Sequence, residues 1–291
     1  MSTKANSEPR AITWIDGDWI ASNPPLLGPM THATWMASVV FDGARSIRRL
    51  APDLDLHCAR VIRSAEIMGL KPPVTAEKIE RLAWEGIDQF GDEAELYIRP
   101  LMYSEEGFVV AVPESTRFIM SVFEAPLPEG KGLRVCLSSF RRPSPDMAPT
   151  DAKTACLYPN VSRALREARG KGYDSAVMLD AQSDVAELAT ANIFMVKEGV
   201  VATPVCNGTF LNGITRQRTM QLLRDDGLSV EERRITYDEL SVADELFATG
   251  NYTKINPVIQ IDDRRLQPGP VSTRAHDLYF AYAERAGGKR P

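Results

Sequence analysis

Apolar residues recur along this chain with two different spacings, and each spacing predicts one kind of secondary structure. Recurrence every three or four residues predicts amphipathic helices at 54–68, from Thr75 onward, and at 161–169, 215–224 and 271–285. Short apolar runs and alternating patterns predict strands at 95–103, 117–123, 134–140, 176–179, 193–196 and 245–248. Because helices and strands are mixed in both halves, the pattern favours an α/β (α+β) fold over a doubly wound parallel sheet.

Turn residues divide these elements and indicate where the chain changes domain. Asp16 and Gly17 stand between alternating residues and predict a hairpin, and the segment 197–199 predicts another. Residues 126–132 combine two prolines with two glycines, which is typical of a linker. We therefore expect a smaller N-terminal α/β domain at 1–125, a linker at 126–133 and a larger C-terminal domain at 134–291.

The composition is that of an ordinary globular protein, and it excludes several classes of function. The 291 residues are 44% hydrophobic and 25% charged, with a formal net charge of −5. A mildly acidic chain does not carry the basic footprint of a nucleic-acid-binding protein, and no run reaches the roughly 20 apolar residues of a membrane span. The polar segment 1–10 does not have the apolar core of a secretory signal, and we expect it to be a frayed tail.

Cysteine and histidine usage bears on metals and on the redox state. The four cysteines and three histidines are scattered along the chain. We therefore expect neither a disulfide framework nor a metal site. Reduced thiols are typical of the cytosol, so a cytoplasmic location is expected.

Two titratable residues stand in apolar surroundings that would change their chemistry. Lys153 lies among small apolar residues after a proline-rich loop, and a lysine in an apolar strand suits Schiff-base chemistry through a lowered pKa. A surface lysine at the start of a strand is the plainer interpretation. Glu187 lies among alanines and a leucine, which fits a buried counter-ion for a protonated ring nitrogen. A capped, exposed turn residue explains Glu187 equally well from the sequence.

A glycine precedes the helix predicted at 215–224. Gly213 and the free backbone N–H groups that follow it, with the hydroxyl of Thr215, fit a phosphate cradle at a helix N-terminus. An ordinary N-cap supplied by Asn212 or Thr215 is the alternative interpretation.

Two pairs of residues could bind carboxylates or other anions. Arg60 and Arg63 lie one turn apart on a predicted helix, so one of them could point inward toward an anion, or both could be solvated. Tyr97 and Arg99 alternate with an apolar residue and therefore share one strand face. That face fits a carboxylate site or an exposed salt bridge.

These features together form the set that a pyridoxal-phosphate transaminase needs: a lysine, a phosphate cradle, an acid for a ring nitrogen and a carboxylate clamp. The chain resembles the class IV (fold-type IV) pyridoxal-phosphate aminotransferases, and within them the branched-chain amino-acid aminotransferases. The resemblance covers nearly the whole chain. The motifs that carry it are Trp14-Ile-Asp-Gly, Val40-Phe-Asp-Gly-Ala-Arg45, His57-x-x-Arg60, Tyr97-Ile-Arg-Pro100, Lys153-x4-Tyr158, Glu187-x4-Asn192 and Leu211-x-Gly-Ile-Thr-Arg216.

The resemblance implies a fold, a reaction and an assembly. The implied fold is the two-domain one of D-amino-acid and branched-chain aminotransferases, with pyridoxal 5'-phosphate between the domains. The implied reaction moves an amino group from a hydrophobic, branched-chain-type amino acid to a 2-oxo acid such as 2-oxoglutarate through a Schiff base on Lys153. The resemblance also implies a homodimer with the active site near the dimer interface, and small molecules rather than nucleic acid or membrane as partners.

The resemblance further assigns roles to single residues. Lys153 would bond the cofactor and shuttle the proton, Tyr158 would bind its phenolic oxygen, and Glu187 would pair with its ring nitrogen. The other cofactor-binding residues that it implies are Arg60, Leu211, Ile214, Thr215, Gly250 and Asn251. The substrate-binding residues that it implies are Phe41, Tyr97, Arg99 and Tyr252.

The chain departs from the branched-chain pattern at two places. Gly250-Asn-Tyr252 stands where many branched-chain enzymes carry Gly-Thr-Ala, and Met36 stands where an aromatic residue is common. These departures leave open an (R)-selective amine or D-amino-acid transaminase with a pyruvate or other 2-oxo acid acceptor, whereas Arg99 favours a carboxylate-bearing substrate. A class IV lyase that releases pyruvate is a further alternative. A cofactor-free binding protein would have no use for the set around Lys153.

Overall fold

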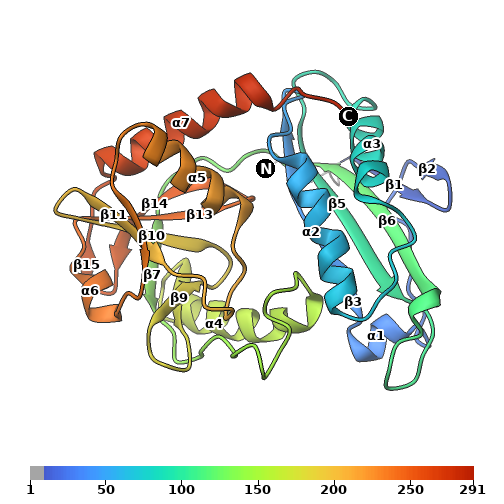
Figure 1. Ribbon diagram of the computed structural model, residues 1–291, viewed down its shortest axis with the longest axis horizontal. Coiled ribbons are helices and arrows are strands. Elements are labelled where there is room, and N and C mark those ends of the chain that lie inside the picture. Colours follow the sequence, from blue (N-terminus) through green and yellow to red (C-terminus); the bar gives the residue numbers. More distant parts are fainter. Residues whose placement is uncertain (1–9) are drawn as a thin grey trace, which may run out of the picture. The chain divides into compact units, whose positions relative to one another are not determined.

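The fold is taken from a computed structural model that describes residues 10–291. The first nine residues of the expected N-terminal tail lie outside the described residues. The described chain forms two compact units, one that ends at Leu127 and takes in Ala286–Pro291, and one that comprises Pro128–Arg285. Each unit has its own sheet (Figure 1) and is described by itself.

The first unit is built on a six-stranded antiparallel sheet. Its strands run in the order β2 (Asp18–Ile20), β1 (Ala11–Ile15), β6 (Thr116–Glu124), β5 (Glu95–Ser104) and β3 (Val39–Phe41), and β4 (Ala44–Ile47) also pairs with β5. Its helices are α1 (His32–Met36), α2 (Leu54–Ile67) and α3 (Ala76–Ile87), with a 3-10 turn, η1, at Pro113–Ser115. Helices α2 and α3 cover one face of the sheet and share a core with it (Figure 1).

Local sequence explains why α3 begins where it does. Thr75 has an extended backbone, and its Oγ1 accepts a hydrogen bond from the backbone N–H of Lys78 at 3.3 Å, which satisfies one unpaired donor of the first turn. Ile79, Leu82 and Ile87 then fall on one buried face. The predicted start of this helix at Thr75 is confirmed.

Strand β5 sorts its residues between the two faces of the sheet. Leu96, Ile98 and Met102 are buried in the core that α2 and α3 cover. Tyr97 and Arg99 alternate with them and therefore point to the opposite face, as the sequence predicts.

The second unit is built on a mixed nine-stranded sheet. The strand order is β12 (Val230–Arg233), β11 (Val200–Pro204), β10 (Asn192–Lys197), β13 (Glu245–Gly250), β14 (Lys254–Ile261), β7 (Leu133–Leu137), β8 (Ser175–Leu179) and β9 (Val185–Leu188), and β15 (Arg264–Arg265) pairs with β14. Only the pairs β11–β12, β14–β7 and β7–β8 are parallel within this unit. Its helices are α4 (Tyr158–Gly170), α5 (Ile214–Asp225), α6 (Tyr237–Ser241) and α7 (Pro270–Ala286), with a 3-10 turn, η2, at Ala155–Leu157.

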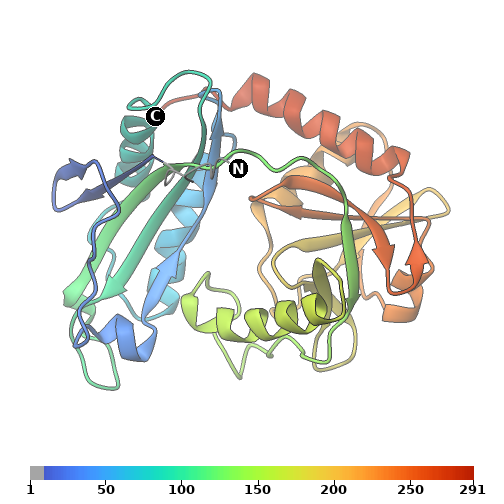
Figure 2. The same ribbon diagram turned by 180° about the vertical axis from the view of Figure 1, so that it is seen from behind.

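Helices pack on this sheet through several apolar clusters. The rings of Phe194 in β10 and Phe247 in β13 stack with centroids 4.9 Å apart, and they share a cluster with residues of α5 and α7. The amphipathic helix α4 buries Val161, Ala164 and Ala168 against β7 and β8 (Figure 2). The α/β character of the fold, predicted from the sequence, is confirmed.

One predicted strand is too long. The strand expected at 134–140 ends at Leu137. The Oγ of Ser138 accepts the N–H of Phe140 at 3.0 Å, and a carboxylate oxygen of Glu167 accepts the N–H of Ser139 at 3.0 Å. These side chains take the place of a neighbouring strand, so the ladder stops.

Membrane-spanning helices and clusters of metal ligands are both absent from the described residues. No helix between residues 10 and 291 is long and apolar enough to cross a membrane. No cluster of three histidine, cysteine or acidic side chains within the same described range could hold a metal ion.

Candidate active site

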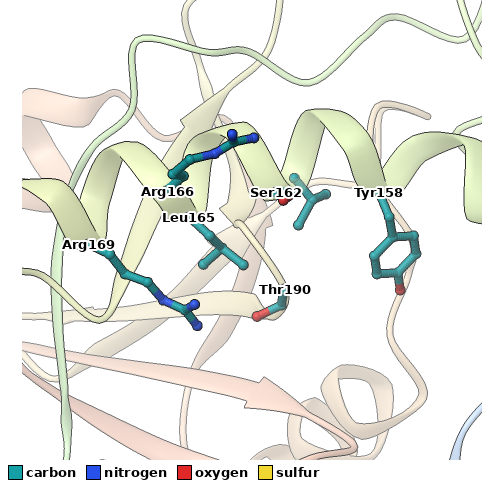
Figure 3. Close-up of a pocket in the computed structure, with 7 residues that line it drawn as sticks. Tyr158, Ser162, Leu165, Arg166, Arg169 and Thr190 are labelled. Carbon is teal, nitrogen blue, oxygen red and sulfur yellow. The ribbon is translucent and has the colours of Figure 1, made fainter.

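The candidate site of the second unit begins in the loop between β7 and α4. Lys153 is half-buried there, and its Nζ donates a hydrogen bond to the Oη of Tyr158 at 3.0 Å. The prediction that Lys153 lies in a strand is wrong, because Lys153 lies in the loop after β7, and η2 begins two residues later at Ala155. A hollow of about 350 Å³ beside α4 is lined by both Tyr158 and Thr190 (Figure 3). The start of α4 therefore adjoins the loop that follows Glu187.

Glu187 lies in strand β9, and its side chain is 12% exposed. Its Oε1 lies 3.4 Å from the Nε of Arg142, and its Oε2 accepts a hydrogen bond from the Nδ2 of Asn192 at 3.3 Å. Burial raises the pKa of Glu187 to about 7, although the charges of Arg142 and Lys153 act to lower it. The interpretation of Glu187 as an exposed turn residue is wrong. A cation placed beside this carboxyl would hold it ionised at neutral pH.

Asn192 links Glu187 to the start of helix α5. Its Nδ2 also donates to the backbone oxygen of Leu211 at 3.1 Å, and a Cβ on Gly213 would lie only 2.1 Å from its Oδ1. Within the described residues, no side chain caps the first turn of α5, so the proposed N-cap by Asn212 or Thr215 is wrong. Uncapped N–H groups at this end of the helix suit an anion.

The turn between β13 and β14 adjoins the same region. Thr249 of β13 lies opposite Asn192 of β10, and a Cβ on Gly250 would contact Ala191 at 3.5 Å. The Oγ1 of Thr249 and the Nδ2 of Asn251 are both buried without a hydrogen-bond partner among the described residues. Two unsatisfied donors beside an uncapped helix start indicate a place for acceptor oxygens.

Three of the predicted substrate-binding residues lie in the first unit, on its sheet. The guanidinium carbon of Arg99 lies 5.2 Å from the centre of the Phe41 ring, and Tyr97 stacks on Phe123 with ring centroids 5.4 Å apart. Arg99 also lines a hollow of about 1140 Å³ on the face opposite α2 and α3. Phe41, Tyr97 and Arg99 are thus brought together, whereas Tyr252 lies in the second unit and is 62% exposed.

Arg60 also belongs to the first unit, where it meets a buried carboxylate. Its Nε and Nη2 donate to the two oxygens of Asp42 at 2.6 and 2.8 Å, and the Nδ1 of His57 lies 2.7 Å from the same carboxylate. Burial alone would raise the pKa of Asp42, but Arg60 and His57 bring it well below its usual range. Arg60 is therefore the inward-pointing arginine of the predicted pair, and Arg63 is exposed.

Comparison with known families adds to this geometry. The family model for aminotransferase class IV matches residues 39–261. The chain belongs to the class IV aminotransferases. The resemblance found in the sequence is thereby confirmed, and so are the enzyme class and the cofactor: this aminotransferase depends on pyridoxal phosphate.

Individual relatives and solved structures agree with this family. A probable branched-chain-amino-acid aminotransferase of Rickettsia bellii is 32% identical over 86% of both chains, and a branched-chain-amino-acid aminotransferase of Pseudomonas aeruginosa is 31% identical over 92% of both. A Brucella abortus aminotransferase bound to pyridoxal phosphate is 45% identical, with a TM-score of 0.93 over 94% of this chain and 99% of that one. The Escherichia coli branched-chain aminotransferase is 27% identical, with a TM-score of 0.87 over 94% of each chain.

The residues of the second unit fit the cofactor chemically. The half-buried amine of Lys153 can meet an aldehyde, and the buried carboxyl of Glu187 can meet a protonated ring nitrogen. The uncapped start of α5 and the unpaired donors of Thr249 and Asn251 can meet a phosphate. The aldehyde, the ring nitrogen and the phosphate of the cofactor therefore each have a chemically complementary group in this aminotransferase.

Sequence reasoning missed several residues that organise this site. Arg142, whose Nε faces Glu187, lies in the proline-rich loop before Lys153, and the sequence assigns it no role. Asn192 and Asp42 stand in motifs without a role. Lys254 was not singled out, although it is among the largest fully buried side chains. An arginine directly before two closely spaced prolines and a lysine at the start of an apolar strand are the signals that could have found Arg142 and Lys254.

Proposed function

We propose that this aminotransferase is of the branched-chain type and moves the amino group of a hydrophobic L-amino acid to a 2-oxo acid such as 2-oxoglutarate. Relatives and structural neighbours that carry the branched-chain name support this substrate class. The observation that carries the proposal is the contact between Arg99 and Phe41 on one sheet face. A guanidinium suits a carboxylate and the adjoining ring suits an apolar side chain, so together they fit a hydrophobic amino acid.

The proposed roles in the second unit follow from charge and position. When bound, pyridoxal phosphate supplies a carbonyl carbon that captures amines and a ring that withdraws electrons. Lys153 would hold that carbonyl carbon and would move the proton at the substrate Cα, and Tyr158 orients the Lys153 Nζ through its hydrogen bond. Glu187 would keep the ring nitrogen protonated.

The remaining residues hold the cofactor's phosphate and ring. Backbone N–H groups at Ile214 and Thr215 would donate to the phosphate, and the side chain of Asn251, next to Gly250, would donate to it as well. Leu211 would pack on the ring. Arg60, whose guanidinium is paired with Asp42 in the first unit, is a further residue that we propose for phosphate binding. The residues that we propose for substrate binding are Phe41, Tyr97, Arg99 and Tyr252.

We further propose a cytoplasmic homodimer whose active site lies near the dimer interface. In the loop between β5 and β6, the side chains of Phe108, Val109 and Val110 are exposed to solvent, and Phe108 is 74% exposed. Its ring contacts Trp35 edge-to-face at 5.3 Å, so the loop and α1 present one apolar tip, formed by these four residues. Exposed apolar patches of this kind are typical of association surfaces, and a second copy of the chain is the occupant that we propose.

A single-turnover spectrum tests the substrate class. The cofactor-loaded protein is mixed separately with L-leucine, D-alanine and (R)-1-phenylethylamine, and conversion to the pyridoxamine form is followed by absorbance. We expect rapid conversion by L-leucine alone. Rapid conversion by D-alanine or the (R)-amine with L-leucine inert would contradict the proposal, as would pyruvate release without an acceptor.

A further inference from the structure

We propose that Lys254 is a positioning residue of the phosphate cradle: its buried ammonium fixes the amide of Asn251 with the N–H₂ group turned toward the phosphate. The inference rests on the proposed role of Asn251 in cofactor binding. It adds a residue that lies behind the cradle and acts through Asn251.

Lys254 stands at a backbone position that favours glycine. It pairs with Gly250 to close the three-residue turn 251–253 between β13 and β14, and its φ is +60°. Three-residue turns commonly place glycine or asparagine in this left-handed conformation, because a side chain is strained there. The contacts that the Lys254 side chain makes offset that strain.

Those contacts fix the orientation of the Asn251 amide. Lys254 is 1% exposed, and its Nζ donates a hydrogen bond to the Oδ1 of Asn251 at 2.7 Å. The Nζ also lies 5.5 Å from the centre of the Tyr279 ring in α7, and this cation–π contact helps to fix the position of the ammonium. An ammonium can only donate, so it must meet the amide oxygen. The Nδ2 of Asn251 is therefore held on the other side of the amide.

The Nδ2 that is held in this way is a buried donor without an acceptor among the described residues. A buried unsatisfied donor is costly, and a bound acceptor removes the cost. The Oγ1 of Thr249, two residues earlier and on strand β13, is also buried without a partner among the described residues. Thr249 lies opposite Asn192, whose side chain abuts Gly213 at the start of α5. The unpaired donors thus lie at the same end of the β10–β13 pair as the uncapped start of α5.

A phosphate is the group that completes this arrangement. It offers several acceptor oxygens and a negative charge, which suit the helix start, the two unpaired donors and the ammonium behind Asn251. The positive charge of Lys254 also polarises the amide and strengthens donation from Nδ2.

Affinity for two forms of the cofactor tests the proposal. The equilibrium binding of pyridoxal phosphate and of pyridoxal, which has no phosphate, is measured on cofactor-free wild type, Lys254→Met, Asn251→Ala and the double variant. We expect Lys254→Met to weaken binding of pyridoxal phosphate about tenfold, or about 1.4 kcal/mol, and to change that of pyridoxal less than twofold. In the Asn251→Ala background the same substitution has no further effect.

Three controls separate positioning from a general structural role. Lys254→Gln keeps a donor for Asn251 without the charge, so it recovers part of the phosphate selectivity. Lys197→Met removes an exposed lysine of the same unit and leaves both affinities unchanged. The ³¹P chemical shift of the bound phosphate moves in Lys254→Met and not in Lys197→Met.

Several outcomes would overturn the inference. An equal loss of affinity for both ligands, or an effect of Lys254→Met that persists without Asn251, would show that Lys254 acts on the fold. If Lys254→Met does not fold, Asn251→Leu takes its place, and an unchanged selectivity for pyridoxal phosphate in that variant also refutes the proposal. Wild type that neither binds pyridoxal phosphate nor transaminates would instead refute the proposed function.

Discussion

At the scale of single residues, the carboxyl of Glu187 ties the stability of the protein to pH. Burial raises its pKa from 4.5 to about 7 in the folded, cofactor-free protein. Between these two values the folded state keeps a proton that the unfolded state has released, so the free energy of unfolding falls as the pH rises through this window. Above about pH 7 both states are ionised and the dependence from this group ends.

Replacing Glu187 with glutamine therefore removes a pH-dependent term from stability. We expect the cofactor-free wild type to lose on the order of 2 kcal/mol relative to Glu187→Gln between pH 5 and pH 8, from a shift of more than one pKa unit. Urea unfolding of both proteins at several pH values measures the difference. Parallel pH profiles would show that Glu187 is not the group that titrates.

We expect activity to depend most directly on Lys153. We expect Lys153→Ala to lower kcat at least about a thousandfold, because it removes the amine that holds the cofactor and moves the proton. The fold persists, because the side chain is only half-buried and lies in a loop. Turnover and thermal unfolding are measured together, with the exposed Lys171→Ala as the matched control. Activity close to that of the control would refute the role.

The sequence predicts a role for each of these residues but not the contacts around them. Lys153, Tyr158 and Glu187 have the types and spacing of a known set, and their roles stay predictions. The contact of Arg142 with Glu187 could not be predicted, because it joins residues 45 positions apart whose approach depends on the completed sheet. The unpaired Nδ2 of Asn251 likewise could not be predicted, because it depends on the hydrogen bond that the folded protein forms between Lys254 and the Asn251 Oδ1.

At the scale of elements, the junction of β10 and α5 depends on one close approach. The φ of Gly213 is −61°, which any residue adopts, so its backbone does not require glycine. The available space does require it, because a Cβ would lie 2.1 Å from the Oδ1 of Asn192. The Nδ2 of the same side chain donates to Glu187 and to the backbone oxygen of Leu211. Glycine is thus required at position 213 by the close approach of Asn192 and not by its backbone conformation.

Gly213→Ala is accordingly expected to displace Asn192. We expect it to destabilise the cofactor-free protein by about 1–3 kcal/mol, since it disturbs buried hydrogen bonds, and to weaken binding of pyridoxal phosphate. Gly170→Ala is the matched control, because a Cβ there meets nothing within 4 Å at the end of α4. Unfolding free energies and cofactor affinities of both variants are compared. An effect of Gly213→Ala no larger than that of the control would contradict the contact.

Elements with a strong periodic pattern were predicted, and elements defined by their partners were not. Helices α2, α3, α5 and α7 were located within a few residues, because their apolar faces recur at helical spacing. The strand containing Glu187 is not among the predicted strands, because β9 owes its state to pairing with β8 rather than to its own residues. Strand order, with β14 beside β7, depends on contacts between distant segments and was not predicted.

At the scale of the whole molecule, the apolar tip in the first unit bears on assembly. Its loop is held by local contacts: Ser104 and Ser115 join across its base, and Gly107 takes a φ of +134° with Val110 close by. Phe108, Val109 and Val110 are therefore held in solvent by an ordered loop. An apolar surface that an ordered loop keeps exposed is typical of a surface that binds a partner.

Phe108→Glu is expected to weaken the proposed homodimer, because a charge buried in an apolar interface is costly. We expect sedimentation velocity at micromolar concentration to show dimers for wild type and mainly monomers for the variant. Val242→Glu, an exposed apolar position in the second unit, serves as the matched control and stays dimeric. If the active site lies near the interface, activity per chain of Phe108→Glu falls on dilution while that of the control does not. A wild type that is monomeric and fully active would contradict the proposed homodimer. A Phe108→Glu variant that dimerises as the wild type does would show that the apolar tip is not part of the dimer interface.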